Sequence, residues 1–289
     1  MQLQRVVIGV DFSDPSWACA RWTVHHFARG ARITLVHVLS GTPAAPGTPA
    51  VTAHELAAHK CSELRSGLPA EDVEIEIVDG PIPDGIARVA QRRDADLIAI
   101  GKHGAGEGAA RGVGSVAEQL ILHPAVPVLL GPGIREGFPR SILAAIGDDP
   151  SKVDVVRWAR WLSEHFEAAC VALSVVGSEL RTHLISMAGL AARGGGVSGL
   201  EFQERDTEIA DGWIAELSSM GSLPETSLGM SERGHTVDEV VAAAERLHSD
   251  LIVLGSRQVV GGVAPDVSVA CGVARRSACP VFIVKAERV

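Results

Sequence analysis

A glycine-containing loop after the apolar run 96–100 holds the clearest chemical signal in the chain. Gly101 and Gly104 begin the loop, and after nine further residues Gly114-Ser115 opens an expected helix. Glycine permits positive φ and close backbone approach, and the first N–H groups of a helix have no partner within it. Phosphate is the usual ligand of such an arrangement. The spacing therefore predicts a nucleotide-binding site.

Two further residues come at the ends of expected buried strands. Asp11 ends the run 5–11, and Val38 lies near the end of the run 33–39. Ligands of open parallel sheets bind at the carboxyl ends of the strands. There the Asp11 carboxylate could accept hydrogen bonds from a ribose or an adenine amino group. A simpler interpretation is also open, in which Asp11 caps a turn and the glycines serve tight loops.

The chain contains an internal repeat. Residues 84–101 (DGIARVAQRRDADLIAIG) and 238–255 (DEVVAAAERLHSDLIVLG) share one pattern at an offset of 154 residues. We therefore predict two related domains of ordinary size, 1–133 and 140–289.

Strand-like runs alternate with helix-like segments in both halves. In the first half we expect strands at 5–11, 33–39, 73–78, 96–100 and 126–130, with a helix that starts at Ser13-Asp14-Pro15 and runs over 17–22, and helices at about 51–66, 82–93 and 115–122. In the second half we expect strands at 142–147, 170–176, 250–254 and 281–284, with helices at 153–166, 179–192 and 203–220. Alternation of this kind predicts a parallel sheet covered on both faces. The fold class is therefore α/β, with two doubly wound domains.

Composition argues against several classes of partner and site. The net charge is −9, aromatic residues make up 4% and tyrosine is absent, so nucleic acid is not an expected partner. No stretch approaches the roughly 20 apolar residues of a membrane helix, so no membrane partner is expected either. The N-terminus enters a strand directly, and we expect a cytoplasmic protein. Five cysteines without a Cys-x-x-Cys pair predict neither a disulfide framework nor a metal site.

The second copy of the glycine motif is degenerate. Gly147 aligns with Asp11, Gln258 takes the place of the second glycine, and Ser268-Val269 replaces Gly114-Ser115. The second half is therefore not expected to bind a nucleotide.

Several of these segments together resemble the universal stress protein family. They are Val10-Asp11-Phe12-Ser13, Leu35-Val36-His37-Val38, Asp96-Leu97-Ile98, and Gly-x2-Gly-x9-Gly-Ser followed by Val116-Ala117-Glu118. The resemblance covers nearly the whole chain in tandem form. It implies a five-stranded parallel sheet in each domain and, as in many members, ATP bound by residues at Gly9, Asp11, Val38, Ile100, Gly101, Gly104, Gly114, Ser115 and Val116.

Two features of the loop depart from the family pattern. Lys102 stands where members more often have a small polar residue, and the span before Gly114 is rich in glycine. Extra glycines raise the entropic cost of ordering the loop on a ligand. Lys102 and Arg111 could offset that cost by meeting phosphates.

The closing apolar strands predict how the two halves associate. A strand at 126–130 or 281–284 leaves an apolar edge, which must be covered or paired. Family members commonly pair this strand across a dimer axis. We therefore expect these two strands to lie antiparallel within one chain, as an intrachain pseudo-dimer, with further homodimerisation left open.

These observations predict a stress-response protein whose first domain binds ATP or another adenine nucleotide, with or without Mg²⁺, as a regulatory ligand. No catalytic residue is predicted, although slow ATP hydrolysis stays open; His37 and His103 are more often structural at such positions. One alternative is a nucleotide-free interaction protein whose segment 179–220 binds a partner or an apolar small molecule. Another is an adenylate-transferring enzyme, but residues 11–14 lack the basic or histidine-containing signature that it would need.

Overall fold

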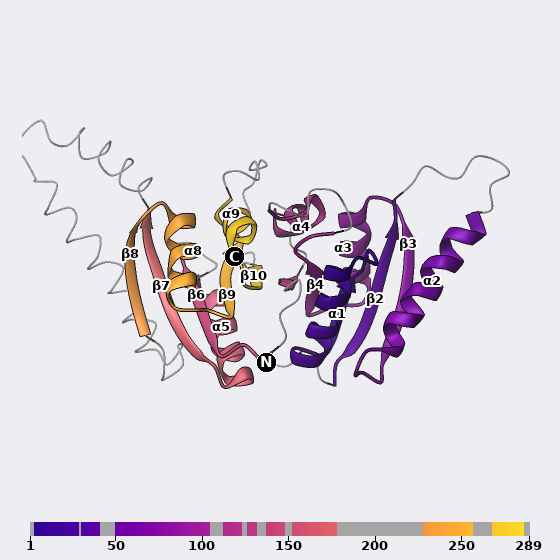
Figure 1. The fold of residues 1–289 in the computed structure, drawn as a ribbon, viewed down its shortest axis with the longest axis horizontal. Helices are drawn as coiled ribbons and strands as arrows, with labels where there is room; N and C mark the ends of the chain where they lie inside the picture. The colour runs from indigo at the N-terminus through magenta and orange to yellow at the C-terminus, as the bar shows by residue number, and fades with distance from the viewer. Residues whose placement is uncertain are drawn as a thin grey trace, which may run out of the picture. The chain divides into compact units, whose positions relative to one another are not determined.

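The computed structural model describes residues 3–28, 30–40, 50–104, 112–122, 126–131, 137–147, 152–177, 228–256 and 268–285. The chain forms two compact units (Figure 1). The first contains Met1–Phe138 and Ser256–Lys285, and the second contains Pro139–Gly255 and Ala286–Val289. Among the described residues, no helix has the length and apolar character needed to cross a membrane.

The first unit has a sheet with the strand order β3-β2-β1-β4-β5-β10. Its strands are β1 (Arg5–Gly9), β2 (Arg32–Leu39), β3 (Val73–Asp79), β4 (Leu97–Gly101), β5 (Val128–Gly131) and β10 (Val281–Lys285). Its helices are α1 (Asp14–His26), α2 (Ala50–Ser66), α3 (Ile82–Arg92), α4 (Ser115–Leu122) and α9 (Val269–Arg276). All neighbouring strands from β3 to β5 are parallel, which confirms the predicted doubly wound domain.

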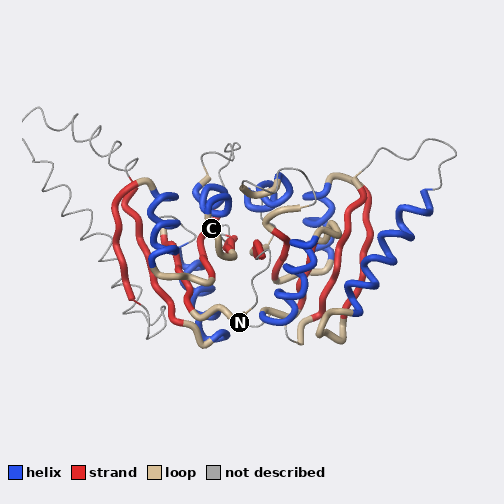
Figure 2. Tube along the Cα trace, in the orientation of Figure 1, coloured by secondary structure: helices blue, strands red, loops and turns tan. Residues whose placement is uncertain are grey.

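The central strands of this sheet are almost continuously apolar, and they form the core. Ile8, Ile98 and Leu129 lie on neighbouring strands and are fully buried. Burial on both faces requires helices on both sides of the sheet. Figure 2 shows the strands of this unit in red with the blue helices packed around them.

The strand β10 pairs with β5 in the antiparallel direction. Val281 lies opposite Leu130, Phe282 opposite Leu129, and Ile283 opposite Val128. The side chains of all these residues are buried. The predicted antiparallel pairing of the two closing strands is therefore confirmed, and the apolar edge of β5 is covered.

The second unit repeats the pattern with the order β9-β6-β7-β8. Its strands are β6 (Ser141–Ile146), β7 (Ala169–Gly177), β8 (Leu228–Gly234) and β9 (Leu251–Ser256), and its helices are α5 (Lys152–Phe166) and α8 (Thr236–Arg246). These strands are also parallel. The strand β8 was not among the sequence predictions. The helices expected at 179–192 and 203–220 lie outside the described residues.

The sequence repeat is visible in matching hydrogen bonds. Asp96 Oδ2 accepts the backbone N–H of Gln4 and of Arg5, which starts β1. At the same offset of 154 residues, Asp250 Oδ2 accepts the N–H of Arg140 and of Ser141, which starts β6. Each aspartate therefore fixes the start of the first strand of its repeat.

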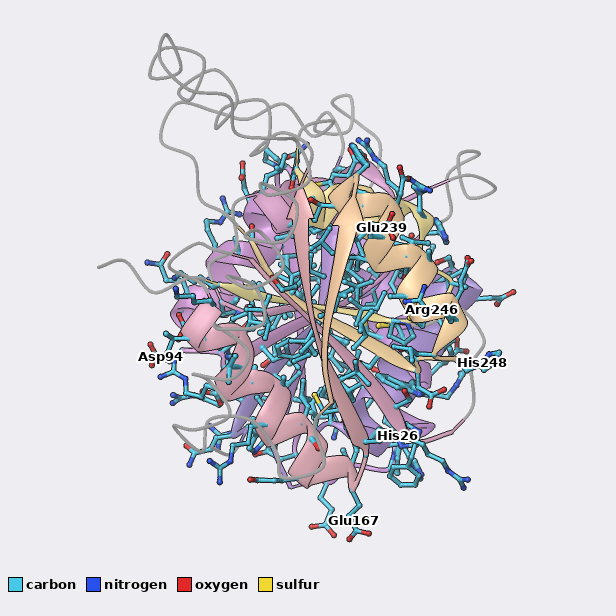
Figure 3. The ribbon with its side chains drawn as sticks, turned by 90° about the vertical axis from the view of Figure 1, so that its left-hand side faces the viewer. His26, Asp94, Glu167, Glu239, Arg246 and His248 are labelled. Carbon is cyan, nitrogen blue, oxygen red and sulfur yellow. The ribbon has the colours of Figure 1, made fainter. Side chains whose placement is uncertain are left out.

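The turns after the repeated helices also match. Asp94 follows α3 with a φ of 46°, and His248 follows α8 with a φ of 49°. Both side chains point outward (Figure 3). The two repeats thus share a left-handed helix terminus as well as a sequence pattern.

Candidate functional site

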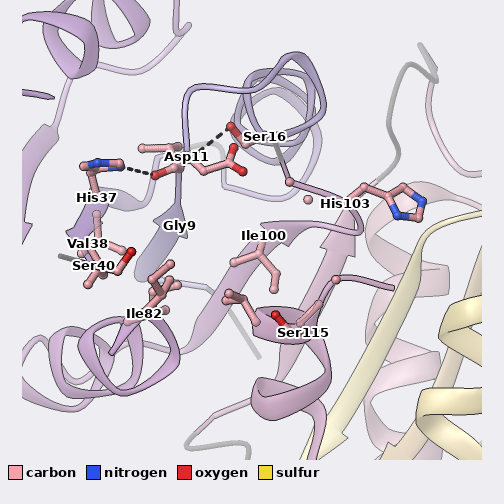
Figure 4. Close-up of a pocket in the computed structure, with 18 of the residues that line it drawn as sticks. Gly9, Asp11, Ser16, His37, Val38, Ser40, Ile82, Ile100, His103 and Ser115 are labelled. Atoms are coloured by element: carbon pink, nitrogen blue, oxygen red, sulfur yellow. Dashed lines mark hydrogen bonds between the residues drawn. The ribbon is translucent and has the colours of Figure 1, made fainter. Parts of the chain in front are cut away.

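A cavity of about 790 Å³ lies at the carboxyl ends of β1, β2 and β4 in the first unit. All nine residues predicted for the nucleotide site line it: Gly9, Asp11, Val38, Ile100, Gly101, Gly104, Gly114, Ser115 and Val116. Figure 4 shows Asp11, Val38 and Ser115 around this space. The structure brings the predicted residues together, while their role in binding remains a prediction.

Asp11 connects the end of β1 with the start of α1. Its Oδ1 atom accepts hydrogen bonds from Ser13 N at 3.0 Å and Ser13 Oγ at 2.6 Å. Ser13 is in turn the N-cap of α1, accepting from Ser16 N. The Oδ1 atom of Asp11 therefore caps a turn, as the simpler interpretation of the sequence predicted. The carboxylate nevertheless lines the cavity and faces Gly104.

One side of the cavity is apolar. Val38 at the end of β2, Ile82 and Ile86 on α3, and Ile100 on β4 line it. Gly9 packs against two of these side chains. A Cβ atom on Gly9 would lie 2.9 Å from Ile100 Cγ2 and 3.0 Å from Ile86 Cδ1, so a larger residue would collide with them. An apolar wall of this kind suits a flat heterocyclic base.

Another part of the lining is formed by backbone and hydroxyl groups. Gly104 and Gly114 line it, and Ser115 begins α4. The first N–H groups of α4 carry the partial positive charge of a helix N-terminus. This part can therefore accept an anionic group such as a phosphate.

Gly101 and Gly104 are required for close approach and not for positive φ. The described glycines with positive φ are Gly30, Gly80, Gly112 and Gly137, so the expectation for Gly101 and Gly104 is corrected. A Cβ atom on Gly101 would lie 3.0 Å from His103 O and 3.4 Å from the backbone at the start of α1. Side chains are excluded here because two backbone segments pack directly together.

Lys102 does not point toward a phosphate site as predicted. Its side chain is buried, and Nζ donates to Ser277 O at 2.8 Å, Ser277 Oγ at 3.0 Å and Cys279 O at 2.6 Å. These acceptors use the three donors of the ammonium group. Arg111, the other predicted phosphate contact, lies outside the described residues.

The two histidines near the site have different surroundings. His37 Nδ1 lies 2.7 Å from Val10 O, and its ring packs on Phe12 with a centroid separation of 4.3 Å. Burial, and secondly the charge of Lys102, lower the pKa of His103. Figure 4 shows the two rings on opposite sides of the cavity. Neither histidine is paired with a nucleophile in these contacts. This agrees with the prediction that His37 and His103 have structural roles.

Sequence reasoning did not assign several residues that line the cavity to the site, among them Ser16, Ser40, Ile82 and Ile86. Ile82 and Ile86 on α3 could have been predicted from the sequence, because residues four apart lie on the same face of a helix that packs on a sheet. Ser16 and Ser40 had no distinctive signal, since isolated serines near strand ends are common in turns.

The second repeat differs at the corresponding positions. Leu97 pairs with Val6, and Leu251, which lies at the repeat offset of 154 from Leu97, pairs with Ile142, so the two strand pairs correspond. Asp11 lies five residues after Val6, and Gly147 lies five residues after Ile142. The alignment of Gly147 with Asp11 is therefore confirmed, and the second repeat has no carboxylate at this position.

The helix that corresponds to α4 also has a different N-terminus. Ser268 precedes α9, and its Oγ accepts the backbone N–H of Cys271 at 3.3 Å. Gly114, at the equivalent place before α4, has no side chain to do this. In α9 the protein itself satisfies an N–H group that an anion would otherwise contact. Gln258 lies outside the described residues.

Comparison with known proteins identifies the family. The model of the universal stress protein family matches residues 2–132 and again residues 139–285. The chain belongs to the universal stress protein family. It is a tandem member, because each half matches the family model separately. No curated protein matched the chain.

Solved structures share the fold of this tandem universal stress protein. A universal stress protein from Archaeoglobus fulgidus DSM 4304 is 17% identical, with a TM-score of 0.70, and the match covers 99% of this chain and 97% of that one. A putative universal stress protein from Pseudomonas aeruginosa UCBPP-PA14 is 14% identical, with a TM-score of 0.64 and coverage of 98% and 93%. At these identities the likeness shows the fold alone.

Proposed function

We propose that the first repeat binds one adenine nucleotide, ATP in particular, as a regulatory ligand in a stress response. The observation that carries this proposal is the cavity in which all nine predicted residues meet. Its volume of about 790 Å³ is within the range typical of small-molecule sites, roughly 300–1,000 Å³.

The two sides of the cavity match the two ends of a nucleotide. The apolar side at Val38, Ile82 and Ile100 would hold the base, and the N-terminus of α4 would hold the phosphates. Asp11 stands between β1 and Gly104, where its carboxylate can accept from a ribose or amino group. The replacement of Asp11 by Gly147 and the capped N-terminus of α9 support a single site per chain.

Mg²⁺ would be bound mainly through the nucleotide. Asp11 is the carboxylate in the described lining, and its Oδ1 atom is engaged by Ser13. Magnesium commonly uses one or two carboxylates together with phosphate oxygens and water. The residues present therefore fit a metal that arrives with the phosphates, and we assign no separate protein site.

The proposal is tested by identifying the nucleotide that the protein carries. Freshly purified full-length protein is denatured, and the released small molecules are separated by chromatography and identified by mass. The same preparation, stripped of ligand, is equilibrated with ATP with and without Mg²⁺. We expect about one adenine nucleotide per chain. A protein that releases none and takes up none would overturn the proposal and favour the nucleotide-free interaction protein.

A further inference from the structure

The loop that begins the candidate site is anchored by a segment far away in the sequence. Lys102 lies between the two cavity glycines Gly101 and Gly104, and it is only 7% exposed. Its ammonium group is held by Ser277 and Cys279, at distances of 2.6–3.0 Å. Ser277 is the C-cap of α9, where the helix dipole favours a positive charge.

The backbone of Lys102 extends this anchor to the other end of the loop. Gly114 N donates to Lys102 O at 2.9 Å, so the residues before and after the span 105–113 are joined directly. Lys102 therefore connects three places: the end of β4, the start of α4, and the residues after α9.

A second contact holds the same region. Arg275 Nε in the last turn of α9 donates to Glu118 Oε1 in the first turn of α4 at 2.7 Å. The two side chains are 30% and 19% exposed, so the ion pair is largely shielded from water. A Cβ atom on Gly112 would also lie 3.8 Å from Arg275 Cγ. Gly112, near the end of the loop, therefore lies beside the segment 268–285, which also holds Lys102 at the beginning of the loop.

We propose that residues 268–285, which belong to the second repeat, hold the nucleotide loop of the first repeat in its binding geometry. Lys102 and Arg275 are the positioning residues, and neither is assigned a direct contact with phosphate. This inference rests on the proposed nucleotide site. It gives the second repeat a function, because its own glycine motif is degenerate while residues of its last helix, and those between this helix and its last strand, hold Lys102 and Glu118 beside the site of the first.

The physical reason is the entropy of the loop. The span 105–113 contains three glycines and is flanked by Gly104 and Gly114, so ordering it on a ligand is costly. Contacts that fix both ends beforehand remove part of that cost from the binding step. By reciprocity, a nucleotide that requires the fixed ends must stabilise the contacts made by residues 268–285 by the same free energy.

The experiment compares Lys102→Met, Lys102→Arg and Arg275→Gln with the wild-type full-length chain. Lys152→Met on α5 serves as the matched control. ATP affinity is measured by calorimetry, and amide hydrogen exchange is measured with and without ATP. Lys102→Met should weaken ATP binding about tenfold, as expected when charge-assisted hydrogen bonds no longer order the loop. Lys102→Arg should restore part of the loss, and Lys152→Met should bind as the wild type does.

Hydrogen exchange separates positioning from a general loss of stability. In the wild type, ATP should slow exchange in residues 268–285, and in Lys102→Met this effect should disappear while the melting temperature stays well above the assay temperature. Without ATP, the variant should exchange faster in residues 100–104 and 112–118. Unchanged affinity together with unchanged exchange in these segments would overturn the inference.

The outcomes also separate this inference from the proposed function. If the wild type binds no ATP, the proposed function fails, whereas the ligand-free exchange still decides whether Lys102 fixes the loop. If Lys102→Met does not fold, Arg275→Gln replaces it. Faster exchange in residues 112–118 of that variant supports the inference, and wild-type exchange there overturns it.

Discussion

Gly104 and Asp11 approach each other so closely that a Cβ atom on Gly104 would lie 2.5 Å from Asp11 Oδ2. The other oxygen of this carboxylate accepts two hydrogen bonds from Ser13. Asp11 therefore cannot rotate away without losing its link to the start of α1. A glycine at position 104 is needed to keep the carboxylate in place at the cavity.

Gly104→Ala should weaken ATP binding roughly tenfold to a hundredfold, because the methyl group displaces Asp11 from its hydrogen bonds. Calorimetry measures the affinity. Gly67→Ala is the matched control, since a Cβ atom there would make only an ordinary contact at 3.6 Å with Leu64 O. Equal affinity in the two variants would contradict this assignment of Gly104.

Asp96→Ala and Asp250→Ala should each lower the free energy of unfolding by about 1–3 kcal/mol, because two backbone N–H groups lose a charged acceptor. Urea denaturation of the full-length chain measures the effect. Asp72→Ala is the control, because its ion pair with Arg32 is more than half exposed and such pairs contribute about 0–1 kcal/mol. A cost no larger than that of the control would show that the two aspartates do not fix the strands.

His103 should make stability depend on pH. Burial and then the Lys102 charge lower its pKa below the ordinary value of 6.5. Near that pH the unfolded chain binds more protons at this residue than the folded chain does, so stability rises with pH. Its contribution is fully present above about pH 6.5, the unfolded value, and is lost as the pH falls from there through the lower pKa of the folded state.

His103→Gln should remove this part of the pH dependence. Free energies of unfolding at pH 8 and pH 5 give the measurement, and the wild type should lose more stability on acidification than the variant does. His248→Gln, at an exposed turn, is the control. Identical pH profiles for the wild type and His103→Gln would contradict the lowered pKa.

Two buried thiols should resist alkylation in the folded protein. Burial raises the pKa of Cys19 to about 11, against smaller opposing hydrogen bonds, and burial also raises the pKa of Cys61 to about 11. At pH 8 only about one such thiol in a thousand is ionised, and the thiolate is the reactive form. Mass mapping after iodoacetamide should show both cysteines unmodified in buffer and modified in urea. Fast labelling of either cysteine in buffer would contradict this prediction, because it would show that the thiol becomes exposed to solvent in the folded protein.

Much of the fold was predictable because its strands are short apolar runs. The expected helix at 115–122 agrees with α4 at both ends. The need to cover an apolar edge, together with the pairing that the family resemblance implies, predicted the pairing of the closing strands. The strand β8 was missed because Leu228–Gly234 contains two glycines and a Ser-Glu-Arg sequence. It lies at the edge of its sheet, where a strand need not be a continuous apolar run.

The site was predictable where chain order places residues at strand ends, as for Asp11, Val38 and Gly101. The role of Lys102 was not predictable in this way. Its acceptors lie 175 and 177 residues away, and two of the three are backbone carbonyl oxygens that carry no sequence signal. A lysine inside a phosphate-binding loop suggests a phosphate contact, and only tertiary structure shows that its charge is already engaged.

The stoichiometry of ATP binding tests the central claim most directly. Full-length protein stripped of ligand is titrated with ATP in a calorimeter, alongside Gly104→Val. The account predicts one site per chain in the wild type and no measurable binding in the variant, because the larger side chain displaces Asp11 and fills the phosphate end of the cavity. Two equivalent sites per chain, or an affinity that Gly104→Val leaves unchanged, would contradict it.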